Sequence, residues 1–170
     1  MPKPRKMLSD RKAPCIQSLV KLTETLDKAT LVIWAVDYSE REILPLWHQF
    51  YPSDLRPQNA ISAARSWLSG SIRLPAAKAA ILECHAAARE ADGNPVAQAA
   101  ARTIGQCAST IHSTRHCLGL AFYGALAVAY DQLGTDAPWE QIEACAAIEC
   151  GRMEDALRAM LRCGQAQPER

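Results

Sequence analysis

The sequence predicts an all-α protein that folds as a compact antiparallel bundle of six to seven helices. Three observations lead to this expectation: alanine supplies thirty of the 170 residues, aromatic residues make up only 6%, and apolar side chains recur at helical spacing. No segment is a convincing candidate for a β-strand. The chain is long enough to bury one sizeable core without disulfides or metal ions.

The first fifteen residues differ from the rest of the chain. Pro2, Pro4 and Pro14 disfavour a helix in this segment. Five basic side chains against Asp10 give residues 1–13 a net charge of +4, which leaves −3 for the remainder of a chain whose total is +1. We therefore expect a mobile basic arm over residues 1–15, a single helical domain over 16–164 and a C-terminal tail over 165–170.

Helical spacing predicts the elements of the first half in order. The first helix covers residues 16–26, the second covers 28–50 behind Asp27 as its N-cap, the third runs from Pro57 to Gly70, and the fourth covers 75–91. Pro45 lies inside the second helix, where it removes a backbone hydrogen bond and crowds the preceding turn. A kink is therefore expected at residues 41–44.

The second half begins with residues 95–132, which form either one long helix or two helices joined near Ser113. A last helix follows Pro138 and ends near Gly164. Small residues on facing stripes, Gly105 and Gly119 among them, allow neighbouring helices to approach closely.

Charge and cysteine usage restrict the partners and the compartment. A net charge of +1 provides no global field that would hold a nucleic acid or an anionic membrane. The longest uncharged apolar run, residues 118–130, is shorter than the about 20 residues that cross a bilayer. Seven widely spaced cysteines without a CxxC pair indicate reduced core thiols, and residues 13–22 lack the features of a secretory signal. These features predict a cytoplasmic protein and argue against a membrane or nucleic-acid partner.

The common catalytic signatures are absent from the sequence. It contains no GxGxxG, P-loop, HExxH or GxSxG motif and no Glu-x-x-His pair for a di-iron centre. These absences favour a protein without catalytic activity and without a cofactor.

The histidines nevertheless offer a candidate metal site. His112 and His116 are four residues apart, so they would share one face of a helix, and His85 could supply a third ligand. The same imidazoles could instead fill a groove through hydrogen bonds, or contact a partner. A nucleophile activated by a histidine also stays open, with three nearby candidates: Cys84, Cys107 and Cys117.

A charged corner is expected between the second and third helices. Asp37 interrupts the apolar run 31–36, so its carboxylate needs a cation, and the candidates are Arg41, Arg56 and Arg65. We interpret Asp37 and Arg56 as an ion pair that fixes this corner, with Asp54 accepting backbone N–H groups of the next helix. Contact of these charges with a partner is the alternative.

The tryptophans of this region divide into two kinds. Trp34 and Trp67 are assigned to the core. Trp47 lies beside His48, Phe50 and Tyr51 in the sequence, and it belongs either to the core or to an exposed aromatic patch.

These residues together resemble a known bacterial family. The first half of the resemblance consists of Trp34-Ala35 with Asp37 and Glu40, Leu44-Pro45, and Asp54-x-Arg56-Pro57-x-x-Ala60-Ile61 with Ala64, Arg65, Trp67 and Gly70. The second half consists of His85-Ala86-Ala87-Ala88-Arg89, Ala99-Ala100-Ala101-Arg102, Gly105, and His112 with His116. Over residues 26–130 the chain resembles the Imm-5-like immunity proteins of bacterial polymorphic toxin systems. It departs from their pattern at Gln106, where another histidine is expected, and this departure weakens the metal site.

The resemblance implies a non-catalytic, all-helical protein that binds and neutralises a cognate toxin. Eight positions match the family motif and carry no assigned catalytic role: Asp37, Asp54, Arg56, Arg65, Trp67, His85, His112 and His116. Two alternatives remain, a metal-binding bundle or enzyme that uses the histidines, and a structural homodimer whose 95–132 helices pack through their small residues.

Overall fold

The computed structural model describes residues 3–165, and it confirms the prediction of an all-α bundle. The predicted tail therefore lies outside the described residues except for Gln165, the last residue of the final helix. The elements in chain order are α1 (Pro14–Thr23), α2 (Lys28–Tyr38), a π-helical turn (Ser39–Ile43), α3 (Leu44–His48), α4 (Arg56–Leu68), α5 (Leu74–Glu90), α6 (Pro95–Ser109), a 3₁₀ helix (Thr114–Leu118), a second π-helical turn (Leu120–Gly124), α7 (Ala125–Leu133) and α8 (Trp139–Gln165).

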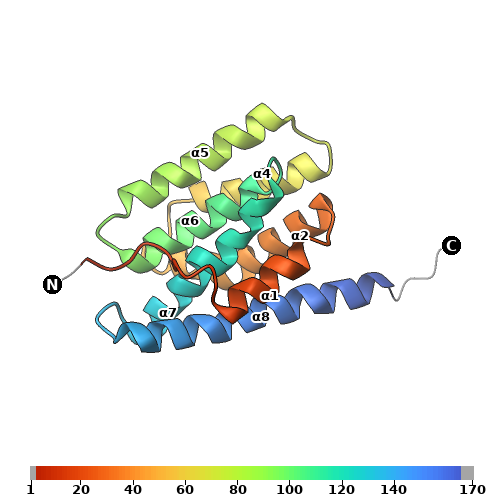
Figure 1. Ribbon diagram of the computed structural model, residues 1–170. Coiled ribbons are helices and arrows are strands. Elements are labelled where there is room, and N and C mark those ends of the chain that lie inside the picture. Colours follow the sequence, from red (N-terminus) through yellow and green to blue (C-terminus); the bar gives the residue numbers. More distant parts are fainter. Residues whose placement is uncertain (1–2, 166–170) are drawn as a thin grey trace.

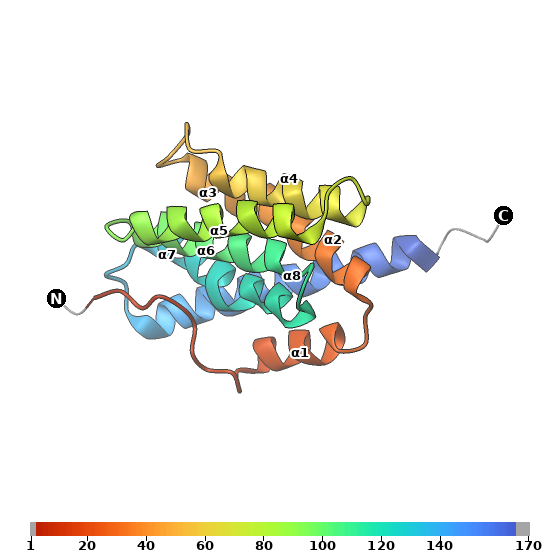
Figure 2. The ribbon, with the colours of Figure 1, turned by 90° about the horizontal axis from the view of Figure 1, so that it is seen from above.

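Helix α6 is the centre of the bundle. It packs against α2, α3, α4, α5 and α7, while α1 and α8 lie together on the side away from α5 (Figures 1 and 2). Twelve of its fifteen residues are buried, and most of them are small. Because alanine and glycine side chains occupy little space, five helices can surround α6 closely. These small residues are buried by helices of the same chain. They are therefore not accessible to a second chain, as the homodimer alternative requires.

The segment from α2 to α3 shows how the chain accommodates Pro45. The N–H of Leu44 bonds the carbonyl of Ser39, five residues back, which is the π-helical pattern. Pro45 then lies in the first turn of α3, where its missing N–H costs nothing. The expected kink at 41–44 thus takes the form of a π-helical turn, and the helix ends at His48 instead of residue 50.

Residues 95–132 form two helical segments separated near Ser113, which was the second of the two alternatives. Helix α6 ends at Ser109, and the chain turns at residues 110–113, where Ser113 is extended (φ −149°). The chain then resumes as the 3₁₀ helix, the second π-helical turn and α7. His112 therefore lies in the turn and His116 in the 3₁₀ helix, so they do not share the face of one α-helix.

The N-terminal arm is not helical over residues 3–13, and it lies against the body. The N–H of Leu8 bonds the Phe122 carbonyl at 2.9 Å, and its side chain is buried. The Tyr130 hydroxyl donates to the Arg5 carbonyl at 2.9 Å, and the Arg5 guanidinium lies 4.0 Å from the centre of the Trp139 ring. The sequence did not predict these contacts. The mobility of the arm stays a prediction.

Buried polar contacts join α2 to α8. The Trp34 indole donates to the Met153 carbonyl at 3.0 Å, and the Tyr38 hydroxyl donates to the buried carboxylate of Glu149. Burial beside this carboxylate raises the pKa of Tyr38, which keeps the phenol protonated as a donor. None of the described helices combines the length and the hydropathy needed to span a bilayer.

Candidate interaction surface

Asp37 forms its ion pair with Arg65 of α4. Arg65 Nη2 lies 2.7 Å from Asp37 Oδ1 and 2.7 Å from Glu40 Oε2, so one guanidinium joins α4 to α2 and the first π-helical turn. The Asp37 side chain is half exposed. The predicted pair between Asp37 and Arg56 is therefore wrong, because the crossing of α2 and α4 brings Arg65 to that carboxylate. Hydrogen bonding from Arg65 lowers the pKa of Glu40.

Arg56 binds two other carboxylates. Its Nη2 lies 2.6 Å from Asp54 Oδ2 and 2.7 Å from Glu90 Oε2, and its own backbone N–H donates to Asp54 Oδ1 at 3.1 Å. Asp54 thus accepts one backbone N–H at the first residue of α4, where several were expected, and Leu55 is the N-cap residue. These hydrogen bonds lower the pKa of Asp54 and of Glu90, and they tie the start of α4 to the end of α5.

The tryptophans are placed partly as expected. Trp34 and Trp47 are buried, and Trp47 stacks on Tyr51 at 4.5 Å between ring centres while its indole donates to the Asp54 carbonyl at 2.8 Å. This placement decides in favour of the core for Trp47. Trp67 is only partly buried, and the Lys28 ammonium lies 6.0 Å from the centre of its ring.

Three histidines from three parts of the chain come together and, with Gln106, form what we call the histidine site. The His112 and His116 rings pack edge to face with centres 5.2 Å apart. His116 Nδ1 lies 2.6 Å from Gln106 Oε1. The His85 ring lies on the backbone of α6, where a Cβ added to Gly105 would be 2.6 Å from His85 Cε1.

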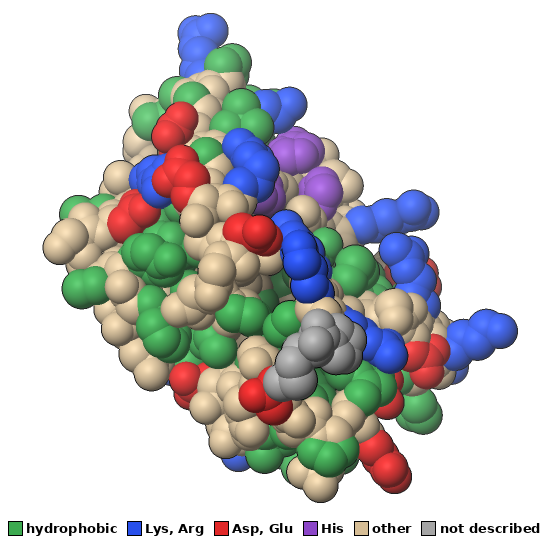
Figure 3. All heavy atoms as spheres, turned by 90° about the vertical axis from the view of Figure 1, so that its left-hand side faces the viewer, with side chains coloured by type: hydrophobic (Ala, Val, Ile, Leu, Met, Phe, Trp, Pro, Cys, Tyr) green, Lys and Arg blue, Asp and Glu red, His purple; other side chains and the backbone are tan. Residues whose placement is uncertain are grey.

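Positive side chains surround the histidine site. Arg89 and Arg102 lower the pKa of His85, and Lys78 and Lys28 lower the pKa of His112, in each case after the larger effect of burial. Burial alone lowers the pKa of His116. We call these four cations the basic rim: Lys28, Lys78, Arg89 and Arg102. Figure 3 shows histidine side chains gathered at one place with Lys and Arg side chains beside them.

Helical spacing contained a signal for part of the basic rim. Lys78, His85 and Arg89 are spaced by seven and four residues along α5, so they share one face of that helix. Arg102 and Gln106 are four residues apart on α6. The contribution of Lys28 depends on the turn at 110–113, which brings His112 toward it, and no sequence spacing marks that approach.

The arrangement of these side chains favours neither a metal site nor an activated cysteine. Within residues 3–164, no group of three or more His, Cys, Asp or Glu side chains is positioned to hold a metal ion. Nδ1 of His116 is hydrogen-bonded to Gln106, and the charged side chains that act on His85 are the cations Arg89 and Arg102. Burial raises the pKa of Cys107 and of Cys117 to about 12 and also raises that of Cys84, so these thiols are protonated at neutral pH.

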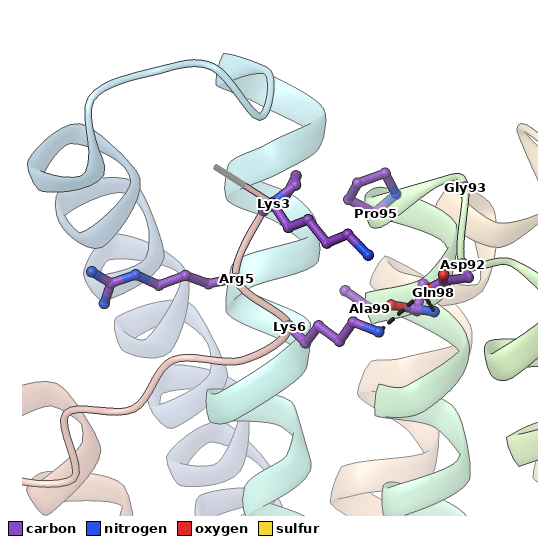
Figure 4. Close-up of a pocket in the computed structure, with 9 residues that line it drawn as sticks. Lys3, Arg5, Lys6, Asp92, Gly93, Pro95, Gln98 and Ala99 are labelled. Carbon is purple, nitrogen blue, oxygen red and sulfur yellow. Dashed lines mark hydrogen bonds and ion pairs between the residues drawn. The ribbon is translucent and has the colours of Figure 1, made fainter. Parts of the chain in front are cut away.

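A second charged recess lies under the N-terminal arm. Lys3 and Lys6 extend toward Gln98 over a cavity of about 300 Å³, while Arg5 points away from it (Figure 4). Lys6 Nζ binds Asp92 Oδ1 at 3.0 Å, and Gln98 also donates to that oxygen. The acid in this recess thus already has an internal partner, which distinguishes the recess from the histidine site.

These features define an all-α protein whose surface carries histidines and cations that form no ion pair within the described residues, together with the ion pairs of Arg56 and Arg65. The chain belongs to the Imm-5 like putative immunity protein family, whose sequence pattern matches residues 21–156. The predicted family resemblance is therefore confirmed, and the match extends into α8. No curated protein and no solved structure matches the chain.

Proposed function

We propose that this protein is an immunity protein that binds a cognate bacterial toxin and neutralises it by stoichiometric binding. Membership of the Imm-5 like family over residues 21–156 is the observation that carries this proposal. The toxin itself would be a protein, so the relevant property of this chain is a surface that recognises another surface.

The geometry supports binding by a surface that is ordered before the partner arrives. Arg65 and Arg56 each join two elements through two carboxylates, which fixes the relative positions of α2, α4 and α5. The histidine site is held by the backbone of α6 and by Gln106. A surface that is already ordered loses less conformational entropy on binding, so more of its contact energy appears as affinity.

The first experiment is a pull-down of the tagged full chain from its native cells, with mass spectrometry against a tag-only control. We expect a retained protein that carries a toxin domain. The purified chain is then titrated against that toxin's activity or toxicity. Inhibition should saturate near a one-to-one ratio, because a binding inhibitor is consumed as it acts.

Two outcomes would contradict the proposal. If the pull-down retains no toxin from cells that express the neighbouring genes, the proposal loses its main support. Complete protection at a small fraction of one equivalent would indicate that the chain inactivates the toxin catalytically.

A further inference from the structure

The histidine site places polar groups where packing alone does not require them. The core around α6 is built mainly from alanine and other small side chains, and at its edge lie one exposed imidazole, His112, and three partly buried polar side chains, His85, His116 and Gln106. Two glycines leave the space that these side chains fill: a Cβ at Gly105 would collide with His85, and one at Gly119 would collide with Gln106. The backbone is therefore adapted to the histidine site.

The charges around the site are unbalanced. Arg89, Arg102 and Lys78 face the imidazoles, and among the described ion pairs none involves a member of the basic rim. Arg56 and Arg65, by contrast, each have two carboxylate partners. The nearest acid, Glu90 beside Arg89, is bound to Arg56, so the cluster keeps an excess of positive charge that suits an anion supplied from outside.

Gln106 determines how His116 can take part. Its Oε1 faces Nδ1 of the ring, so Nδ1 carries the hydrogen and donates. In the neutral imidazole, Nε2 is then an acceptor and cannot bond an anion. When Nε2 gains a proton it becomes a second donor, and an anion bound there stabilises the protonated ring.

We propose that the histidine site and the basic rim bind a carboxylate-rich segment of the partner protein. The identity of that partner as a toxin rests on the proposed function, whereas the preference for carboxylates rests on the site alone. Each bound carboxylate gains charge-assisted hydrogen bonds from arginine or lysine and from imidazolium, and binding takes up protons at neutral pH.

An acidic protein segment fits this surface better than a nucleic acid does. The excess of positive charge is local, since the whole chain carries +1 and the part beyond the arm carries −3. A nucleic acid extends far beyond four cations, so it would meet this negative remainder. A few carboxylates on a loop or a helix can be accommodated within the basic rim.

The test uses a fluorescently labelled hexaglutamate peptide and the full chain, with binding followed by anisotropy in phosphate-free buffer of low ionic strength. Binding should be tighter at about pH 5.5 than at about pH 7.5, by up to tenfold for each unit of pH if one proton is taken up. Most glutamate side chains stay ionised at pH 5.5, and protonation of the peptide would weaken binding, so a gain at the lower pH belongs to the protein.

Variants assign the effect to the site. Arg102→Gln should weaken binding at both pH values, because it removes a permanent charge. His116→Gln should leave binding at the higher pH largely intact and reduce the gain at the lower pH. Lys21→Gln and Arg162→Gln are matched controls, because both remove exposed cations on other helices and should leave binding unchanged. Melting temperatures establish that each variant is folded.

The proposal is overturned if the controls weaken binding as much as Arg102→Gln, if affinity does not change with pH, or if a single-stranded DNA hexamer binds more tightly than the peptide. The toxin assay separates this inference from the proposed function. A toxin that is retained equally by Arg102→Gln and by the parent would overturn the inference and leave the immunity function intact. Site-specific peptide binding without a retained toxin would do the reverse.

Discussion

Gly105 and Gly119 act through the side chains they lack. Each leaves a space that one polar side chain of the histidine site fills, His85 in the first case and Gln106 in the second. Because a methyl group at either position would overlap its neighbour, the orientation of the imidazoles depends on the absence of two Cβ atoms.

Gly105→Ala should displace the His85 ring and destabilise the protein by about 1 to 3 kcal/mol, as overpacking does. The free energy of unfolding from denaturant titration measures this cost. Gly151→Ala is the control, because nothing lies within 4 Å of its Cβ position in α8, and alanine there should stabilise by up to about 1 kcal/mol. Adding His85→Ala to Gly105→Ala should recover part of the loss. Equal effects of the two glycine substitutions would contradict this account.

The sequence identified the residues of the site better than it identified their partners. His85, His112 and His116 do come together, although through a turn and a 3₁₀ helix instead of one helical face. Asp37 needed a cation, yet choosing between Arg56 and Arg65 requires the crossing of α2 with α4, which no local spacing contains. Glu90 and Glu149 were missed because only the packing of distant helices gives them partners.

Proline and glycine marked the helices reliably at the scale of elements. Pro57, Pro75 and Pro95 each lie in the first turn of their helix, and Gly70 follows α4 with a φ of +75° that few other residues adopt. The π-helical turns and the 3₁₀ helix were not foreseen as such. They have the same apolar spacing as an α-helix over so few residues, so the pattern cannot separate them.

The buried link between α2 and α8 leads to a prediction about Tyr38. Tyr38→Phe should destabilise the protein by about 1 to 3 kcal/mol, because it removes the phenol that donates to the buried Glu149 carboxylate. Tyr123→Phe is the matched control, since that hydroxyl makes only a long contact with Met7 sulfur. Chemical denaturation measures both variants.

A double-mutant cycle gives the strength of this link. The cost of Tyr38→Phe should be smaller in a Glu149→Gln background, because a neutral amide loses less than a carboxylate when a donor is removed. Additive effects of the two substitutions would show that the hydroxyl and the carboxylate do not interact.

Leu8 anchors the N-terminal arm through its buried side chain and its bond to Phe122. Leu8→Ala should release the arm at a cost of about 2 kcal/mol and accelerate tryptic cleavage after Lys6, Arg11 and Lys12. Leu55→Ala, which truncates a half-exposed leucine, should leave the cleavage rate unchanged. If the parent is already cleaved there as fast as Leu8→Ala, the arm is mobile as the sequence predicted.

The histidines give the whole molecule a stability that depends on pH. The pKa values of His85, His112 and His116 are all lowered in the folded protein, whereas in the unfolded chain they return to about 6.5. As the pH falls below about 7, the unfolded chain therefore binds protons first, and the free energy of unfolding should decrease.

Denaturant titrations at about pH 7.5 and about pH 5.5 measure this decrease. The carboxylates of Glu40 and Asp54 have lowered pKa values and lose their contribution only below about pH 4.5, so this interval isolates the histidines. His112→Gln should reduce the slope. A free energy of unfolding that stays constant or rises toward the lower pH would contradict the assignment.

Contacts between distant parts of the chain also determine when the native fold can be completed during synthesis. Leu8 bonds Phe122, Arg5 lies over Trp139, and α1 packs against α8. The arm and α1 precede α7 and α8 in the chain, so they reach these native neighbours only after the later helices have been translated. Until then, the apolar face of α1, which carries Ile16 and Leu19, lacks the helix that covers it in the folded protein.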